Sequence, residues 1–255
     1  MSNSVYSLED KVAIVTGGKE GIGKAIALAY ARAGADVAVC SRMVEDGKLQ
    51  AVAEEIQELG RRSLAVRADI TRRTDVDNLV QRVVDKFGDV DILVNNAGVL
   101  IMAPLLETTE EDWDETIDTH LKGYYFCCQA VGKRMVERKR GNIVCISSAL
   151  ALKATPGRGV YSIAKAGVIM LTKMLALELG SNNIRVNAIV PGLVRTKMIE
   201  YLTSDAEALR QREAQIPLGR IGEPDNIART ALFLVSDASS HITGHTVTVD
   251  GGVLA

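Results

Sequence analysis

Two side chains in the middle of the chain have the types and spacing that proton transfer needs. Tyr161 and Lys165 occupy positions i and i+4 of a helical pattern, so their side chains share one face. An ammonium group beside a phenol favours the phenolate and lowers the phenol pKa from about 10 toward neutrality. Ser148 precedes them at the end of a strand pattern, where its hydroxyl would orient a substrate oxygen. Tyr161 is therefore predicted to act as a general acid and base.

A glycine-rich turn near the start of the chain predicts a phosphate site. The strand pattern Val12–Thr16 leads directly into Gly17-Gly18-Lys19-Glu20-Gly21-Ile22-Gly23, and a helical pattern follows. Glycines allow backbone N–H groups to approach a pyrophosphate, which the helix N-terminus stabilises. Gly18 to Lys24 also fits most of a nucleotide-triphosphatase loop, but Ala25 stands where a Ser or Thr hydroxyl must bind magnesium. The dinucleotide reading is favoured.

The end of the second strand pattern bears on the choice of cofactor. An acidic residue is expected there if a ribose 2'-hydroxyl is bound, but the chain has Ser41 followed by Arg42. A guanidinium supplies a counter-charge for a 2'-phosphate, so NADP is predicted, with NAD as the alternative. Glu20 counts against NADP and Lys19 fits either cofactor. Arg42 as an ordinary surface residue remains open.

The elements that must position these residues alternate between short β-branched strands and longer amphipathic helices. Buried parallel strands joined by helical crossovers give a doubly wound sheet. We expect an α/β Rossmann-type fold of about seven strands, with helices on both faces, in a single domain spanning 1–255. The expected strands are Val12–Thr16, Asp36–Cys40, Ser63–Asp69, Asp91–Asn95, Asn142–Ser147, Arg185–Val190 and Thr246–Val249, and the helices are Gly23–Ala33, Lys48–Leu59, Val76–Phe87, Glu110–Arg138, Tyr161–Leu179 and Asp225–Val235.

One segment breaks this alternation. Residues 197–223 are polar and helical in pattern between two strands, which is typical of a substrate lid, although a helical excursion that only packs would look the same. A capping box is expected at Thr108-x-x-Glu111.

Composition points to a soluble cytoplasmic protein. Hydrophobic residues make up 47% and charged residues 24%, and the net charge of -2 gives no reason to expect nucleic acid or an anionic membrane as a partner. No signal segment and no apolar run long enough to span a bilayer is expected. The four cysteines lack Cys-x-x-Cys spacing and are interpreted as reduced core thiols, and no metal site is predicted.

The motifs together resemble those of the short-chain dehydrogenase/reductase family over essentially the whole chain. The matching stretches are Thr16-Gly-x-x-x-Gly21-x-Gly23, Asn95-Asn96-Ala97-Gly98, Ser148, Tyr161-x-x-x-Lys165, Pro191-Gly192 with Thr196, and Asp250-Gly251-Gly252. The resemblance implies hydride transfer between a nicotinamide and a carbonyl or secondary alcohol. It implies that Tyr161 passes the proton, Ser148 holds the carbonyl and Lys165 binds the nicotinamide ribose. It also implies a homotetramer.

The resemblance further implies a set of cofactor contacts. Asp69 and Ile70 would border the adenine, and Thr196 would meet the carboxamide. The full expected set is Gly17, Lys19, Gly21, Ile22, Gly23, Ser41, Arg42, Asp69, Ile70, Asn95, Ala97, Gly98, Tyr161, Lys165, Pro191, Gly192, Val194 and Thr196. Asn95 could instead be a strand-end residue that pins the sheet, or do both.

One position departs from the family pattern. His120 stands where the family has an asparagine that links the lysine to a water chain. A neutral imidazole both donates and accepts, so it would replace the amide in the relay, and it would bring a titration near pH 6.5 into the rate profile. The alternative is a histidine that only packs on its helix.

The substrate side is predicted to be apolar, with cations at its mouth. An apolar lining suits a partly hydrophobic ketone or alcohol, while Arg158 or Arg195 would accept a carboxylate or a phosphopantetheine arm, so 3-oxoacyl, ketone and sugar-acid substrates all stay open. The expected lining is Leu100, Ile101, Met102, Leu150, Leu152, Met198, Ile199, Tyr201 and Leu202. A dinucleotide sensor without catalysis is the alternative function.

Overall fold

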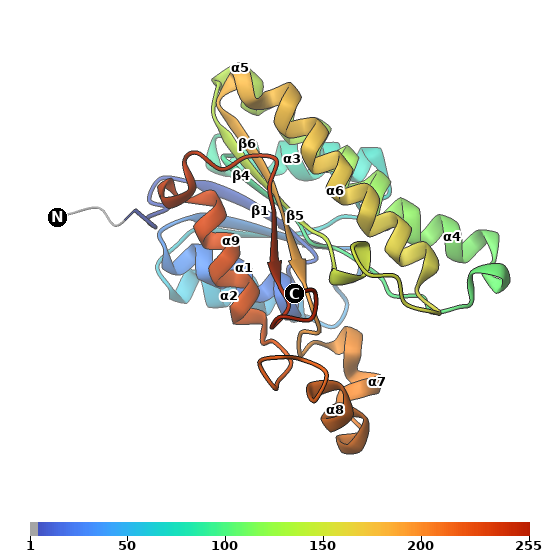
Figure 1. The fold of residues 1–255 in the computed structure, drawn as a ribbon. Coiled ribbons are helices and arrows are strands. Elements are labelled where there is room, and N and C mark those ends of the chain that lie inside the picture. Colours follow the sequence, from blue (N-terminus) through green and yellow to red (C-terminus); the bar gives the residue numbers. More distant parts are fainter. Residues whose placement is uncertain (1–4) are drawn as a thin grey trace.

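Seven parallel strands form one central sheet (Figure 1). The computed structural model describes residues 5–255. The strand order is β3-β2-β1-β4-β5-β6-β7, so the chain builds outward from β1 in one direction and then restarts from β1 in the other. The strands are β1 Val12–Thr16, β2 Asp36–Ser41, β3 Ser63–Arg67, β4 Ile92–Asn95, β5 Gly141–Ile146, β6 Ile184–Pro191 and β7 Thr246–Val249. The doubly wound fold predicted from the strand and helix patterns is confirmed.

Both faces of the sheet are buried because its strands carry apolar side chains on each side. In β1, Ala13 and Val15 pack into one hydrophobic cluster, while Val12 and Ile14 pack into the other. The first cluster is covered by α1 Gly21–Arg32, α2 Lys48–Glu58 and α9 Pro224–Val235. The second is covered by α3 Arg73–Phe87, α5 Gly123–Arg138 and α6 Gly159–Leu179. Figure 1 shows α1, α2 and α9 together on one side and α5 with α6 on the other.

The helix expected over Glu110–Arg138 is not continuous. It consists of α4 Glu110–Ile117, a π turn (η2) over Asp118–Lys122, and α5. The N-cap is Thr109, whose hydroxyl accepts a hydrogen bond from the backbone N–H of Asp112. The capping box expected at Thr108-x-x-Glu111 is therefore wrong. π turns occur often at functional sites, and this one carries His120.

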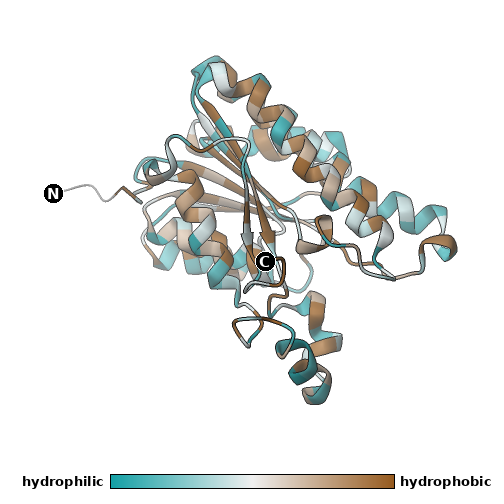
Figure 2. Cartoon of the chain, viewed as in Figure 1, coloured by the Kyte–Doolittle hydropathy of each residue, from teal (hydrophilic) through white to brown (hydrophobic). Residues whose placement is uncertain are grey.

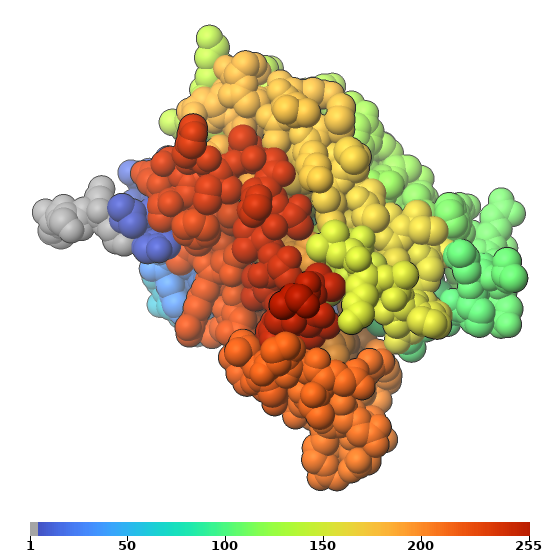
Figure 3. Space-filling model, in the orientation of Figure 1, coloured from blue at the N-terminus to red at the C-terminus, as the bar shows by residue number. Residues whose placement is uncertain are grey.

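The segment that follows β6 folds as short helices beyond the carboxyl ends of the strands. It contains the 3-10 turn η5 Lys197–Ile199, α7 Glu200–Thr203 and α8 Ala206–Glu213. Ile199, Ile216 and Ile221 form a small hydrophobic cluster of their own, against which Val253 packs. Figure 3 shows the C-terminal end of the chain, in dark red, lying against this orange segment. The other 3-10 turns are η1 Leu105–Glu107, η3 Ala149–Ala151, η4 Gly180–Asn182 and η6 Asp237–Ser239.

α6 is more apolar than a surface helix needs to be. Figure 2 shows apolar bands along it. By length and composition alone, Gly159–Asn182 would be able to cross a membrane, which corrects the expectation that no such segment exists. One face of α6 packs on the sheet, and the same helix carries Tyr161 and Lys165. Part of this composition belongs to the core, while other apolar side chains of α6 are exposed.

Candidate active site

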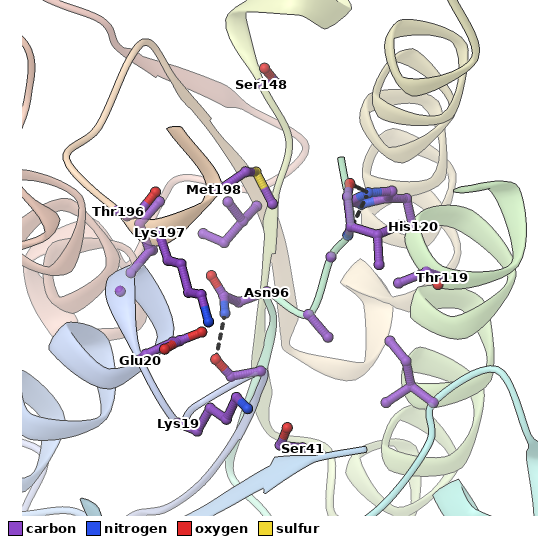
Figure 4. Close-up of a pocket in the computed structure, with 18 of the residues that line it drawn as sticks. Lys19, Glu20, Ser41, Asn96, Thr119, His120, Ser148, Thr196, Lys197 and Met198 are labelled. Carbon is purple, nitrogen blue, oxygen red and sulfur yellow. Dashed lines mark hydrogen bonds between the residues drawn. The ribbon is translucent and has the colours of Figure 1, made fainter. Parts of the chain in front are cut away.

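A cleft of about 390 Å³ opens at the carboxyl ends of the strands. Its walls come from the loops after β1 and β4, which is the point where the strand order reverses and where doubly wound folds bind ligands. Figure 4 shows Glu20 and Thr196 on one wall, Thr119 and His120 on the other, and Asn96 between them.

The glycines shape the floor of the cleft. Gly17 and Gly21 have φ angles of 64° and 58°, a region that side chains with a Cβ disfavour. A Cβ on Gly17 would also lie 2.7 Å from the Cα of Ala97. Gly23 lies beneath the loop, where a Cβ would overlap the carbonyl oxygen of Gly17. The loop therefore needs glycine for close backbone approach, not for mobility.

Side chains from the neighbouring strand hold this loop in place. The Thr16 hydroxyl donates to the Val94 carbonyl at 3.2 Å and accepts from the backbone N–H groups of Asn96 and Ala97 at 2.9 and 3.1 Å. The Asn96 amide donates to the carbonyls of Thr16 and Gly17 at 2.9 and 3.1 Å. These bonds fix the phosphate turn against β4.

The N-terminus of α1 is the anion-binding element. Its N-cap residue, Glu20, makes no capping hydrogen bond, and the Glu20 carboxylate pairs with Lys48 at 3.0 Å instead. The first backbone N–H groups of α1 thus lack a side-chain partner and border the cleft, and the helix dipole favours negative charge there. Together with the glycine loop, they fit the pyrophosphate of a dinucleotide.

Two cations border the end of the cleft where the second ribose would lie. Arg42 pairs with Glu115 at 2.9 Å, and Lys19 pairs with Asp46 at 3.0 Å. The two side chains of the Arg42–Glu115 pair are 46% and 43% exposed, so the pair contributes little to stability and yields readily to a stronger anion. Ser41 lies beside them. Two basic side chains and a hydroxyl thus border this end of the cleft.

Tyr161 and Lys165 both reach the cleft from the first turns of α6. They are 8% and 3% exposed. The Lys165 ammonium donates to the Ile146 carbonyl at 2.7 Å and to the Tyr124 hydroxyl at 3.4 Å, and it lies 5.7 Å from the centre of the Tyr161 ring. The Ser147 hydroxyl donates to the carbonyl of Lys165 at 2.8 Å. Lys165 is thus held by β5 and α5 beside Tyr161, not bonded to it.

The titration of the pair differs from the sequence prediction. Burial raises the pKa of Tyr161 to about 12, with the Ser148 hydroxyl acting in the opposite direction. Burial also lowers the pKa of Lys165 to about 7. The expected lowering of the Tyr161 pKa by Lys165 is therefore wrong for this structure. Desolvation sets the pKa of Tyr161, and the Lys165 ammonium is directed at Ile146 and Tyr124 instead of the Tyr161 hydroxyl.

His120 is buried next to Tyr161. Its ring meets the Tyr161 ring edge-on at 5.1 Å, and its Nε2 lies 2.7 Å from the Val99 carbonyl oxygen. The short distance favours the tautomer with the proton on Nε2, and Nδ1 is then a buried acceptor with no hydrogen-bond partner among residues 5–255. Burial and the charge of Lys165 lower the pKa of His120 well below its usual value. The expected titration near pH 6.5 is wrong, and His120 is neutral.

The structure brings most of the predicted residues together in this one cleft. Those that line it are Gly17, Lys19, Gly21, Ile22, Ser41, Arg42, Asp69, Ile70, Ala97, Gly98, His120, Ser148, Tyr161, Lys165, Pro191, Gly192, Val194 and Thr196. Asn95 does not line it. Asn95 is fully buried, and its amide points to Cys128 and Cys145, with the Cys128 sulfur at 3.1 Å. Asn96, the next residue of the same motif, takes the place predicted for Asn95.

The apolar substrate lining is only partly as expected. Met198 and Ile199 line the cleft. Met102, Leu152 and Tyr201 are about half exposed and do not line the cleft, and Leu202 is buried in α7. Thr119 and Ile146 border the cleft without having been predicted, since nothing in a single sequence distinguishes them from ordinary helix and strand residues.

Comparison with known proteins agrees with this geometry. A family model described as enoyl-(acyl carrier protein) reductase matches residues 17–254. The 3-oxoacyl-[acyl-carrier-protein] reductase FabG of Staphylococcus epidermidis is 42% identical over 244 residues, which cover 96% of this chain and 99% of that protein. The chain belongs to the short-chain dehydrogenase/reductase family. The relatives are reductases, which supports the binding of a nicotinamide dinucleotide and an oxidoreductase activity for this chain.

Two solved structures extend the comparison. A putative short-chain alcohol dehydrogenase from Sinorhizobium meliloti superposes with a TM-score of 0.94 at 38% identity, covering 98% of this chain and 99% of that one. A gluconate 5-dehydrogenase from Burkholderia cenocepacia, in complex with NADP and tartrate, has a TM-score of 0.93 at 30% identity, covering 99% and 98%. The chain therefore shares its fold with a dehydrogenase whose structure contains NADP.

Proposed function

We propose that this family member reduces a carbonyl group, or oxidises the matching secondary alcohol, with Tyr161 as the proton donor and acceptor. A bound nicotinamide supplies or takes up the hydride, and its oxidised ring adds a positive charge to the site. The observation that carries the proposal is that Ser148, Tyr161 and Lys165 line the same cleft as the glycine loop. A hydride donor and a proton donor are both needed at a carbonyl.

Each side chain has one task in this proposal. The Ser148 hydroxyl donates a hydrogen bond to the substrate oxygen and orients it, and the Tyr161 hydroxyl transfers the proton to that oxygen. Lys165 holds the nicotinamide ribose and raises the positive charge near Tyr161. Since burial alone raises the pKa of Tyr161 to about 12, charge brought into the cleft has to offset desolvation before Tyr161 can exchange its proton near neutrality.

The cofactor proposed is NADP, with NAD as the alternative. Arg42, Lys19 and Ser41 border one end of the cleft and no carboxylate follows β2 at its end, which favours a 2'-phosphate. A structural relative binds NADP, which adds support. Asp69 accepts hydrogen bonds from the backbone and hydroxyl of Thr71, and we place it at the adenine.

His120 is proposed to act in the proton path as a neutral group. Its unpartnered Nδ1 is an acceptor that a water molecule would satisfy, and that water would connect toward Lys165. The variant His120→Asn keeps a short polar group that can bond Val99 and is expected to retain most of kcat. The variant His120→Ala should lower kcat, and full activity in both would remove the relay role.

The substrate class is proposed from relatives of the chain, and the lid is proposed from the residues that border the cleft. A 3-oxoacyl or sugar-acid substrate is proposed, because relatives named for such substrates share nearly the whole chain. Residues 197–223 are proposed as the substrate lid, since Met198 and Ile199 border the cleft. We place the protein in the cytoplasm, with no nucleic-acid or membrane partner.

A homotetramer is proposed because α6 presents an apolar stripe to the outside. Ile163, Met170, Met174 and Leu177 share one face of the helix and are 46%, 57%, 47% and 80% exposed. A second copy of the chain would cover this face. Light scattering should give four times the chain mass, and Leu177→Glu should shift it toward smaller species.

The test of the function is turnover across a panel of substrates. Absorbance at 340 nm is followed with NADPH and NADH against ketones, 3-oxoacyl thioesters and sugar acids. Oxidation of either cofactor that depends on a carbonyl substrate supports the proposal. Tight cofactor binding without turnover of any substrate would favour the alternative, a dinucleotide sensor on the same fold.

A further inference from the structure

Arg158 does not line the cleft, but it lies three residues before Tyr161, which does, and it has no acidic partner among residues 5–255. The Arg158 guanidinium donates to the Tyr201 hydroxyl at 3.1 Å and to the Gly157 carbonyl at 3.2 Å, and its carbon lies 5.9 Å from the centre of the Tyr201 ring. No carboxylate forms an ion pair with it among residues 5–255. Both of its hydrogen-bond acceptors are neutral.

This contact joins α6 to the segment that follows β6. Arg158 is the N-cap of α6, directly before the turn that carries Tyr161, and it forms a backbone bridge with Ala103 from the loop that follows Gly98. Tyr201 lies in α7, shortly after Met198 and Ile199, which line the cleft. The guanidinium therefore lies between the catalytic helix and the lid segment.

Arg42, which lines the cleft, and Arg195, which lines a separate neighbouring hollow, differ from Arg158 in charge balance. Arg195 pairs with Glu223 at 3.0 Å, and Arg42 pairs with Glu115 at 2.9 Å. Arg158 is partly buried, has no carboxylate partner among residues 5–255 and has N–H groups beyond the two that are bonded. A planar guanidinium with spare donors is suited to bind an oxyanion through two parallel hydrogen bonds.

We propose that Arg158 and Tyr201 form a subsite for an oxyanion carried by the substrate, either a carboxylate or a phosphate. This rests on the proposed carbonyl chemistry at Tyr161. The anion binds the guanidinium through two hydrogen bonds, and the Tyr201 hydroxyl, released from Arg158, donates to the same anion. The subsite thereby selects substrates that carry a negative charge. The same contacts hold α7 over the bound substrate.

The test compares charged and uncharged versions of the same ketone. Levulinate is paired with methyl levulinate, and dihydroxyacetone phosphate with dihydroxyacetone. The parent, Arg158→Gln, Arg158→Lys and Tyr201→Phe are compared, with Arg82→Gln on the exposed face of α3 as the charge-matched control. Binding to the NADP⁺-loaded protein, which cannot reduce a ketone, is measured by calorimetry, and turnover with NADPH is followed at 340 nm.

The proposal predicts that the parent binds at least one anion more tightly than its uncharged partner. Arg158→Gln should reduce this preference at least tenfold, mainly through KM. Arg158→Lys should restore part of it, Tyr201→Phe should weaken it two- to fivefold, and Arg82→Gln should leave it unchanged. The pair that responds identifies the oxyanion as carboxylate or phosphate.

Two results separate this proposal from the function itself. If neither anion binds better than its uncharged partner, or if Arg158→Gln keeps the full preference, the subsite does not exist, whether or not turnover occurs. If the anions bind through Arg158 but no carbonyl oxidises NADPH, the subsite stands and the enzymatic proposal fails.

Discussion

The buried ammonium of Lys165 should cost the folded protein stability in a pH-dependent way. Its pKa falls from 10.5 to about 7, which corresponds to about 5 kcal/mol of unfavourable desolvation when it is charged. Replacing Lys165 by Met removes this cost but also removes hydrogen bonds to Ile146 and Tyr124, worth about 1–3 kcal/mol together. At pH 6 we expect Lys165→Met to be about 2–4 kcal/mol more stable than the parent.

The sign of the pH dependence follows from proton binding. Between pH 7 and pH 10.5 the unfolded chain holds more protons at Lys165 than the folded chain does, so the stability of the parent rises with pH in this window. By pH 9.5 the parent should have recovered about 3 kcal/mol, because pH 9.5 lies about 2.5 pKa units above the folded value. The advantage of Lys165→Met should then have largely disappeared.

Urea denaturation of parent and variant at pH 6 and pH 9.5 measures this difference. Lys86→Met, at an exposed lysine of α3, is the control and should show no such pH-dependent gain. A stability difference between Lys165→Met and the parent that is the same at both pH values would refute the reasoning, because it would mean that Lys165 is not desolvated. Activity should be lost in Lys165→Met at both pH values.

Four further substitutions test the cleft. A Cβ on Gly98 would lie 2.5 Å from the His120 ring, so Gly98→Ala should lower kcat/KM at least tenfold, and much less when combined with His120→Asn. Since the pKa of His120 lies well below its usual value, His120→Asn should leave the pH–rate profile between pH 6 and pH 8 unchanged, and a shifted profile would contradict a neutral histidine. Gly23→Ala should raise the Kd for the dinucleotide by at least tenfold, as measured by calorimetry, because the new methyl group displaces the phosphate loop. Arg42→Ala should raise KM for NADP about tenfold and leave KM for NAD unchanged, whereas an unaltered preference would remove Arg42 from cofactor selection.

The sheet and the location of the site could be predicted because they depend on local patterns. Runs such as Val12–Thr16 are apolar on both faces, and β1 is buried along its whole length, as a central parallel strand must be. The Gly17–Gly23 turn lies between a strand pattern and a helical pattern, so the sequence alone predicts its position at the carboxyl end of β1. The i, i+4 spacing of Tyr161 and Lys165 put both into one cleft.

The details that failed depend on tertiary surroundings. Asn95 and Asn96 are identical residue types, and only the packing of Cys128 and Cys145 decides which amide turns into the core. The π turn at His120 shifts the register of the helix, and no residue type in this stretch predicts such a turn from the sequence.

The pKa values of the site failed for the same reason. A charged neighbour is visible in a sequence, but the amount of water excluded is not. The desolvation that raises the pKa of Tyr161 and lowers that of Lys165 comes from residues distant in the chain.

The most direct test of the account is the variant Tyr161→Phe, which removes the hydroxyl and keeps the ring that packs on His120. With a substrate found in the panel, we expect kcat/KM to fall at least a hundredfold while the Kd for NADPH stays within threefold of the parent value. Turnover as fast as that of the parent would contradict the central claim, because Tyr161 would then not transfer the proton.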